Sequence, residues 1–167
     1  MSGTLGGGAG GPLIAGYSIP IKHQEQHHEN ACWATCLAMV LKWAGEDFTK
    51  EAIFTDAPNI IPEYRYGDTA TLTETNYMSN KITKGKVTFQ SIEREIFRKA
   101  DAEYWIAYIN KFKPILFSMN NHCRILMGYN GVGQLLILDP AKETKTQPEP
   151  MGIGVFRQGA MDVRVMK

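Results

Sequence analysis

Residues 27–40 read HHENACWATCLAMV, and this stretch decides how the rest of the chain is interpreted. From 31 to 44 the apolar residues recur with the i, i+3, i+4, i+7 spacing of an amphipathic helix. They are Trp33, Cys36, Leu37, Val40, Leu41 and Ala44. Asn30 is the expected N-cap, Lys42 falls in the last turn and Gly45 suits the C′ position. The pattern therefore predicts a helix with Cys32 at its second position, N2.

Cys32 would then lie among the unpaired backbone N–H groups at the positive end of the helix dipole. A thiol in that position ionises more readily, and the thiolate is the nucleophilic form of cysteine. The alternative is that Cys32 is a small buried residue that only packs. A reactive thiolate needs a base and a group that orients the base, so the rest of the chain has to supply both.

The remaining segments predict one α+β domain over residues 13–167, which is long enough to bury a core. Residues 1–12, MSGTLGGGAGGP, have the composition of a flexible linker. Residues 58–88 favour loop with room for one short helix, and a helical region over 91–110 is broken near Asp101. Short apolar runs at 114–119, 122–129, 134–139 and 162–166 predict strands, and NGVG at 130–133 predicts a hairpin. Helices followed by antiparallel strands are typical of the α+β class.

Composition argues against several classes of protein. Lys and Arg number 18 against 17 Asp and Glu, so no field of one sign points to a nucleic-acid partner. No apolar run is long enough to span a membrane and no Sec signal is visible, so we expect a soluble domain without a membrane partner. Three cysteines, two of them one helical turn apart at Cys32 and Cys36, favour a reducing, cytoplasmic-type compartment.

Three further residues have the chemistry that a cysteine nucleophile needs. Gln26 lies six residues before Cys32, where its side-chain amide can join the Cys32 N–H in an oxyanion hole. His122 begins a predicted strand and suits a general base, and Asp139 ends the next strand, where its carboxylate can orient the imidazole. The alternatives are an ordinary strand-edge histidine and a turn-forming aspartate before Pro140.

Three motifs, Q-x5-CWA at 26–34, NNHCRILMGYN at 120–130 and LLILDP at 135–140, together resemble the papain-like (clan CA) cysteine peptidases. The resemblance is to the compact bacterial branch, which includes double-glycine leader peptidases and effector or toxin proteases. It implies a papain-like fold in which an N-terminal helix carries the nucleophile and packs on a small antiparallel sheet. By position it makes Cys32 the nucleophile, Gln26 the oxyanion-hole donor, His122 the base, Asp139 its orienter and Trp33 a residue of the substrate cleft. It implies neither a cofactor nor a metal.

The resemblance leads us to expect a protease that cleaves a specific protein substrate at or after glycine through a thioester. It further implies a bacterial effector or toxin domain, secreted by a Sec-independent route and paired with an immunity or inhibitor protein. A papain-fold glutamine deamidase or acyltransferase, or a binding module with an inactive triad, are the alternatives. The glycines at 6–11 suggest a processing site, although a linker is the simpler interpretation.

Other residues suggest further sites, and each has an argument against it. His23 and His27 are four residues apart, as metal ligands on a helix would be, but no matching pair lies elsewhere in the chain. Gln24 competes with Gln26 as an oxyanion donor and fits the spacing less well. Cys36 and Cys123 are expected in the core.

Overall fold

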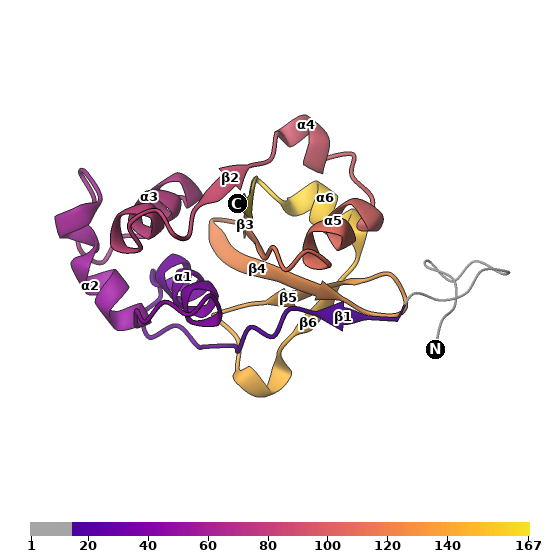
Figure 1. Cartoon of the computed structure of the whole chain (residues 1–167), viewed down its shortest axis with the longest axis horizontal. Helices are drawn as coiled ribbons and strands as arrows, with labels where there is room; N and C mark the ends of the chain where they lie inside the picture. The colour runs from indigo at the N-terminus through magenta and orange to yellow at the C-terminus, as the bar shows by residue number, and fades with distance from the viewer. Residues whose placement is uncertain (1–14) are drawn as a thin grey trace, which may run out of the picture.

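The computed structural model describes residues 15–167, so the predicted linker at 1–12 and its processing hypothesis lie outside the described residues. The helices of the described part are α1 (Cys32–Trp43), α2 (Lys50–Ile60), α3 (Leu72–Ile82), α4 (Arg94–Phe97), α5 (Ala102–Ile109) and α6 (Ile153–Gly159). The strands there are β1 (Tyr17–Ser18), β2 (Phe89–Ser91), β3 (Ile115–Met119), β4 (His122–Tyr129), β5 (Leu135–Leu138), β6 (Glu149–Met151) and β7 (Asp162–Met166). Figure 1 shows α1, α2 and α3 gathered at one end of the molecule and α4, α5 and α6 at the other.

The strands form one antiparallel sheet in the order β2-β7-β3-β4-β5-β6, with β1 paired to the end of β4. The predicted α+β class is therefore confirmed. The turn between β3 and β4 uses Asn120 and Asn121 at positive φ, a conformation that asparagine tolerates better than most residues. The turn places His122 at the first position of β4, opposite Met119. The predicted hairpin at 130–133 joins β4 to β5.

Helix α1 begins one residue later than predicted. Its N-cap is Ala31, which offers no side-chain acceptor, so Cys32 is the first helical residue and not the second. The Asn30 side chain donates instead to the carbonyl of Gly67, at 2.9 Å. The predicted end is confirmed: Gly45 has φ +87°, and the N–H groups of Gly45 and Glu46 close back on the last turn as a Schellman motif.

Residues 58–88 contain the end of α2 and one further helix, the 11-residue α3, among turns and loops, which agrees with the predicted loop region that holds one helix. Thr71 and Glu74 form a capping box at the start of α3, a local signal that T-x-x-E carries in the sequence. The buried face of α3 includes Thr75 and Ser79, whose hydroxyls bond backbone carbonyls, so its apolar period is weak. The predicted break near Asp101 is confirmed, since Asp101 caps α5.

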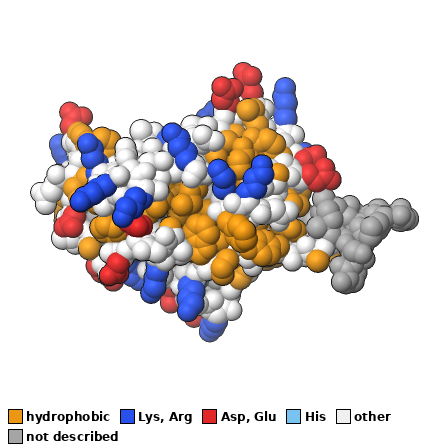
Figure 2. Space-filling view, in the orientation of Figure 1, with side chains coloured by type: hydrophobic (Ala, Val, Ile, Leu, Met, Phe, Trp, Pro, Cys, Tyr) orange, Lys and Arg blue, Asp and Glu red, His pale blue; other side chains and the backbone are white. Residues whose placement is uncertain are grey.

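The core joins α1 to the sheet. Ten of the twelve residues of α1 are buried, and the helix packs along β4. On the other side, the Phe156 ring of α6 packs against Phe117 of β3, with ring centres 5.0 Å apart. In Figure 2, basic and acidic side chains are scattered over the visible face. None of the helices within residues 15–167 is long and apolar enough to cross a bilayer.

Candidate active site

Three chain segments meet at the amino-terminal end of α1. Strands β4 and β5 run antiparallel with Ile125 opposite Leu138. The first residue of β4 and the last residue of β5 therefore lie at the same end of this strand pair. His122 and Asp139 are therefore neighbours, and the His122 Nε2–H donates to Asp139 Oδ1 at 2.6 Å. The other ring nitrogen, Nδ1, makes no contact with Asp139, and the His122 side chain lies close enough to Cys32 to lower the pKa of its thiol. The three side chains thus lie together, with His122 between the thiol of Cys32 and the carboxylate of Asp139.

The charges of these three side chains stabilise one another. Burial raises the pKa of the Cys32 thiol, but the hydrogen bond with His122 and the backbone N–H of Cys123 outweigh it, and the pKa is lowered. For His122 burial acts to lower the pKa, while the bonds to Asp139 and Cys32 raise it to about 9. The pKa of Asp139 is held low by His122 against its own burial. At neutral pH these directions favour a thiolate beside an imidazolium.

Asp139 is almost completely buried, at 1% exposure, and is held by partners that the sequence analysis did not identify. The backbone N–H of Ala141 donates to Oδ1 at 2.9 Å, and Arg124 Nε lies 3.2 Å from Oδ2. The ring of His23 donates from Nε2 to the Asp139 carbonyl at 2.6 Å and its Nδ1 lies 2.9 Å from Thr144 Oγ1. Arg124 lies two residues beyond His122 on β4, and this strand period was the one signal that could have found it.

Gln26 lies on the segment that leads into α1. Its backbone N–H donates to the Pro140 carbonyl at 2.8 Å, which ties this segment to the turn after Asp139. Its side-chain Nε2 donates to the carbonyls of His28 and Glu29, at 3.0 and 3.1 Å, and its buried Oε1 has no hydrogen-bond partner. A role as oxyanion donor requires the amide to turn toward the substrate, and that role stays a prediction.

The other residues singled out from the sequence lie in the core or on the entering segment. Trp33 is fully buried and packs against Phe54 and Tyr64, so its side chain lies in the core and does not line the hollow at Cys32. Cys36 is also buried, and burial raises the pKa of its thiol well above the usual range. Cys123 is buried too, but it borders that hollow.

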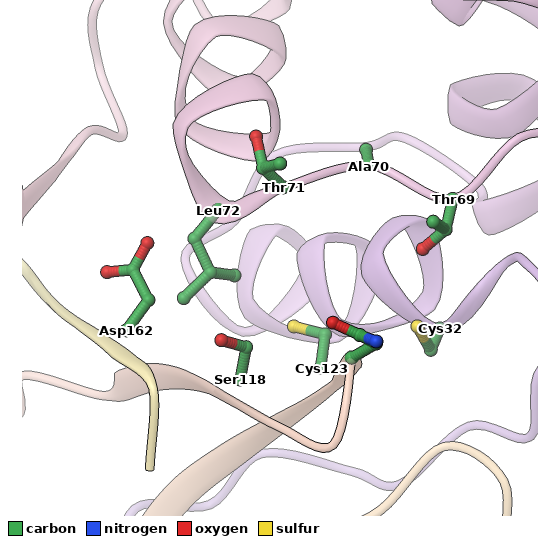
Figure 3. Close-up of a pocket in the computed structure, with 9 residues that line it drawn as sticks. Cys32, Thr69, Ala70, Thr71, Leu72, Ser118, Cys123 and Asp162 are labelled. Atoms are coloured by element: carbon green, nitrogen blue, oxygen red, sulfur yellow. The ribbon is translucent and has the colours of Figure 1, made fainter.

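A hollow of about 310 Å³ opens beside Cys32. Its walls come from the segment before α3, from β3 and β4 with their turn, and from the start of β7. The lining residues are Cys32, Thr69, Ala70, Thr71, Leu72, Ser118, Asn121, Cys123 and Asp162. Figure 3 shows Cys32 at one end and Asp162 at the other, with Leu72 and Ser118 between them. The thiol therefore borders a space that can receive part of a polypeptide.

The described residues contain no group of three or more His, Cys, Asp or Glu side chains arranged to hold a metal ion. His23 is occupied by Asp139 and Thr144, and the His27 ring packs edge-on against Phe54. The three cysteines of the chain are all free thiols.

Comparison with solved structures places this fold among known peptidases. A double glycine motif protease from an AMS/PCAT transporter, solved in complex with the leader peptide, superposes with a TM-score of 0.60 at 19% identity, over 89% of this chain and 91% of that one. The peptidase domain of Streptococcus ComA, a bi-functional ABC transporter involved in a quorum sensing pathway, gives 0.59 at 18% identity, over 87% and 96%. UfSP from C. elegans gives 0.61 at 12% identity, over 95% of this chain and 35% of that one.

Comparison with curated proteins finds no match. The family model described as "Peptidase_C39 like family" matches residues 18–155, which include Cys32, His122 and Asp139. The match covers most of the chain, and the solved structures share its fold. The chain therefore belongs to the Peptidase_C39 like family and is a papain-like cysteine peptidase.

Proposed function

We propose that this domain hydrolyses a peptide bond of a specific protein substrate, at or after glycine, with Cys32, His122 and Asp139 as its catalytic triad. The observation that carries the proposal is that the thiol of Cys32 borders the hollow, has a lowered pKa beside His122, and that His122 is hydrogen-bonded to buried Asp139. Nucleophilic acyl transfer requires this arrangement of groups: a thiol with a lowered pKa, a base beside the thiol, and a buried carboxylate that orients the base.

In the first half of the reaction, the Cys32 thiolate attacks the substrate carbonyl carbon and the carbonyl electron pair moves onto oxygen. The Cys32 N–H is free to hold this oxyanion because the first intrahelical bond of α1 is donated by Thr35. The C–N bond then breaks while the His122 imidazolium gives its proton to the leaving amine, and a thioester remains on Cys32. The Gln26 amide would add a second oxyanion donor after turning.

In the second half, neutral His122 removes a proton from water, and the resulting hydroxide attacks the thioester carbon. The C–S bond breaks, the acid product leaves, and the thiolate and imidazolium are restored. Asp139 keeps its hydrogen bond to Nε2 throughout, so Nδ1 stays directed at the reacting atoms.

The preference for glycine rests on two observations. One similar structure is a double glycine motif protease with its leader peptide bound. In this chain Cys32 is only 4% exposed, so a scissile bond reaches its sulfur only if the substrate backbone approaches closely. Glycine permits that approach because it has no Cβ.

A role as a bacterial effector or toxin, delivered into a reducing compartment and restrained by an immunity protein, is retained as part of the proposal. Its support is the sequence resemblance together with the three free thiols, of which Cys32 has to stay reduced to react. Co-purification of the domain with the product of a neighbouring gene, and loss of activity in that complex, would test it.

The test of the proposed function compares lysates treated with wild type, Cys32→Ala and Cys36→Ala, by mass spectrometry of newly formed protein N-termini. Cys36→Ala is a matched control, since it removes a buried thiol one helical turn from the nucleophile. We expect a small set of new termini that follow glycine, present with wild type and Cys36→Ala and absent with Cys32→Ala. Identical termini in all three samples would refute proteolysis, and one-dalton shifts in the same samples would favour a deamidase.

A further inference from the structure

Arg124 makes an unusual contact with the site. Its side chain is 19% exposed, and its Nε lies 3.2 Å from Asp139 Oδ2 without the alignment of a hydrogen bond. Its Nη1 contacts the sulfur of Met119 at 3.3 Å. His122 holds the other carboxylate oxygen, Oδ1, at 2.6 Å. Asp139 is therefore shared between two cationic side chains of the same strand, β4.

The sharing matters at one stage of the proposed reaction. In the resting site the Cys32 thiolate and the Asp139 carboxylate face the His122 imidazolium and the Arg124 guanidinium, so the four charges cancel. After the thioester forms, Cys32 carries no charge and His122 has lost its proton to the leaving amine. Arg124 is then the one cation of the four residues that remains to balance buried Asp139.

We propose that Arg124 is a positioning residue for thioester hydrolysis: by holding the Oδ2 side of Asp139, it lets His122 stay neutral and accept a proton from water. The inference rests on the proposed function. Without Arg124, the whole negative charge of Asp139 would act on His122, which would then bind a proton more tightly. The first half of the reaction starts from imidazolium, so it would not be slowed in the same way.

The charged and titratable groups around the His122–Asp139 pair come from four segments. Cys32 and Cys36 lie on α1, Arg124 on β4 itself and Asp139 directly after β5. His23 of the entering segment bonds the Asp139 carbonyl. Among them, Arg124 contacts the Asp139 carboxylate and stays cationic at every pH at which the enzyme can work.

The experiment uses 4-nitrophenyl acetate, a small activated ester that acylates cysteine thiolates without any need for the natural substrate. Nitrophenolate release reports acylation of Cys32, and loss of the acetyl group in intact-mass spectra reports hydrolysis of the thioester. Both rates are measured from about pH 6 to about pH 9 for wild type, Arg124→Met, Arg124→Gln and Arg124→Lys, with Cys32→Ala as the inactive reference. Arg157→Met is the matched control: Arg157 is a partly buried arginine whose Nε bonds the Ala100 carbonyl.

We expect Arg124→Met and Arg124→Gln to acylate within about threefold of wild type but to hydrolyse the thioester about tenfold more slowly at neutral pH, as a one-unit shift of the His122 titration gives. Their hydrolysis profile should move about one unit to higher pH, and acetyl-enzyme should accumulate. Arg124→Lys should restore hydrolysis, because the contact is a charge contact without hydrogen-bond alignment.

Three results would overturn the inference. If acylation and thioester hydrolysis are slowed equally and the pH dependence of hydrolysis does not move, Arg124 only supports packing. Arg157→Met shows how large an effect on packing alone is. If the pH dependence of thioester hydrolysis is unchanged in Arg124→Met and Arg124→Gln, Arg124 has no role in the reaction, and the assignment of the triad is not affected. A wild type that is acylated no faster than Cys32→Ala would refute the proposed function and the inference with it.

Discussion

Replacing Asp139 by asparagine tests the charge balance of the site most directly. The change keeps the size of the side chain and an oxygen acceptor for His122 Nε2, but removes the negative charge 2.6 Å away. The pKa of His122 is raised from its ordinary value of 6.5 to about 9. The hydrogen bond with Asp139 contributes more to this rise than the interaction with Cys32 does. Each unit corresponds to a factor of about ten in proton affinity.

We therefore expect the pKa of His122 in Asp139→Asn to fall by about one to two units. Imidazolium would then be scarcer near neutral pH, and the Cys32 thiolate would lose its hydrogen-bonded partner. The rate of Cys32 alkylation by iodoacetamide at about pH 6 should fall about tenfold to a hundredfold, and peptidase activity with it. The assay is intact-mass spectrometry against time over a range of pH.

Asp162→Asn is the matched control for this change. Asp162 is an aspartate at the far end of the same hollow and is paired with Arg164 at 3.1 Å. The variant Asp162→Asn should leave the pH dependence of Cys32 alkylation as it is in the wild type. If Asp139→Asn has the wild-type profile, or if Asp162→Asn displaces it equally, the assignment of Asp139 as the group that supports His122 is refuted.

Three further predictions follow from single contacts. Gln26→Ala should lower kcat about a hundredfold or more, as loss of an oxyanion donor does, and leave Cys32 alkylation unchanged; equal kinetics would remove Gln26 from the oxyanion hole. Thr71→Ala removes the hydroxyl that accepts the Glu74 N–H and should cost about 1 kcal/mol, a fall in Tm of about 2–4 °C by calorimetry. In Cys32→Ala the His122–Asp139 pair remains. Its contribution to the free energy of unfolding should be complete below pH 6.5 while Asp139 is ionised, and it should be lost as pH rises through the raised pKa of His122. Urea unfolding should show this loss, and Cys32→Ala combined with His122→Gln should not.

Local patterns determined a large part of this fold. Helix α1 was predictable because apolar residues recur at helical spacing from Trp33 to Leu41, and because Gly45 ends it in a left-handed conformation. The predicted strands were recognisable as short apolar runs, and the β4–β5 hairpin by its turn. Cys32, His122 and Asp139 were recognisable as candidates through their order and flanking motifs. These signals lie within a few neighbouring residues, where side-chain periodicity and turn chemistry act.

The tertiary structure decided which of these residues meet. The His122–Asp139 contact depends on the antiparallel register of β4 and β5, and the bond from His23 to the Asp139 carbonyl joins residues 116 positions apart. The bounds of helix α3 were not predictable from its apolar period, because Thr75 and Ser79 lie on its buried face and bond backbone carbonyls through their hydroxyls. Arg124 could have been placed on the same side of β4 as His122, but its pairing with the second oxygen of Asp139 could not. Contacts between distant residues depend on how the whole chain packs, and no local pattern encodes that.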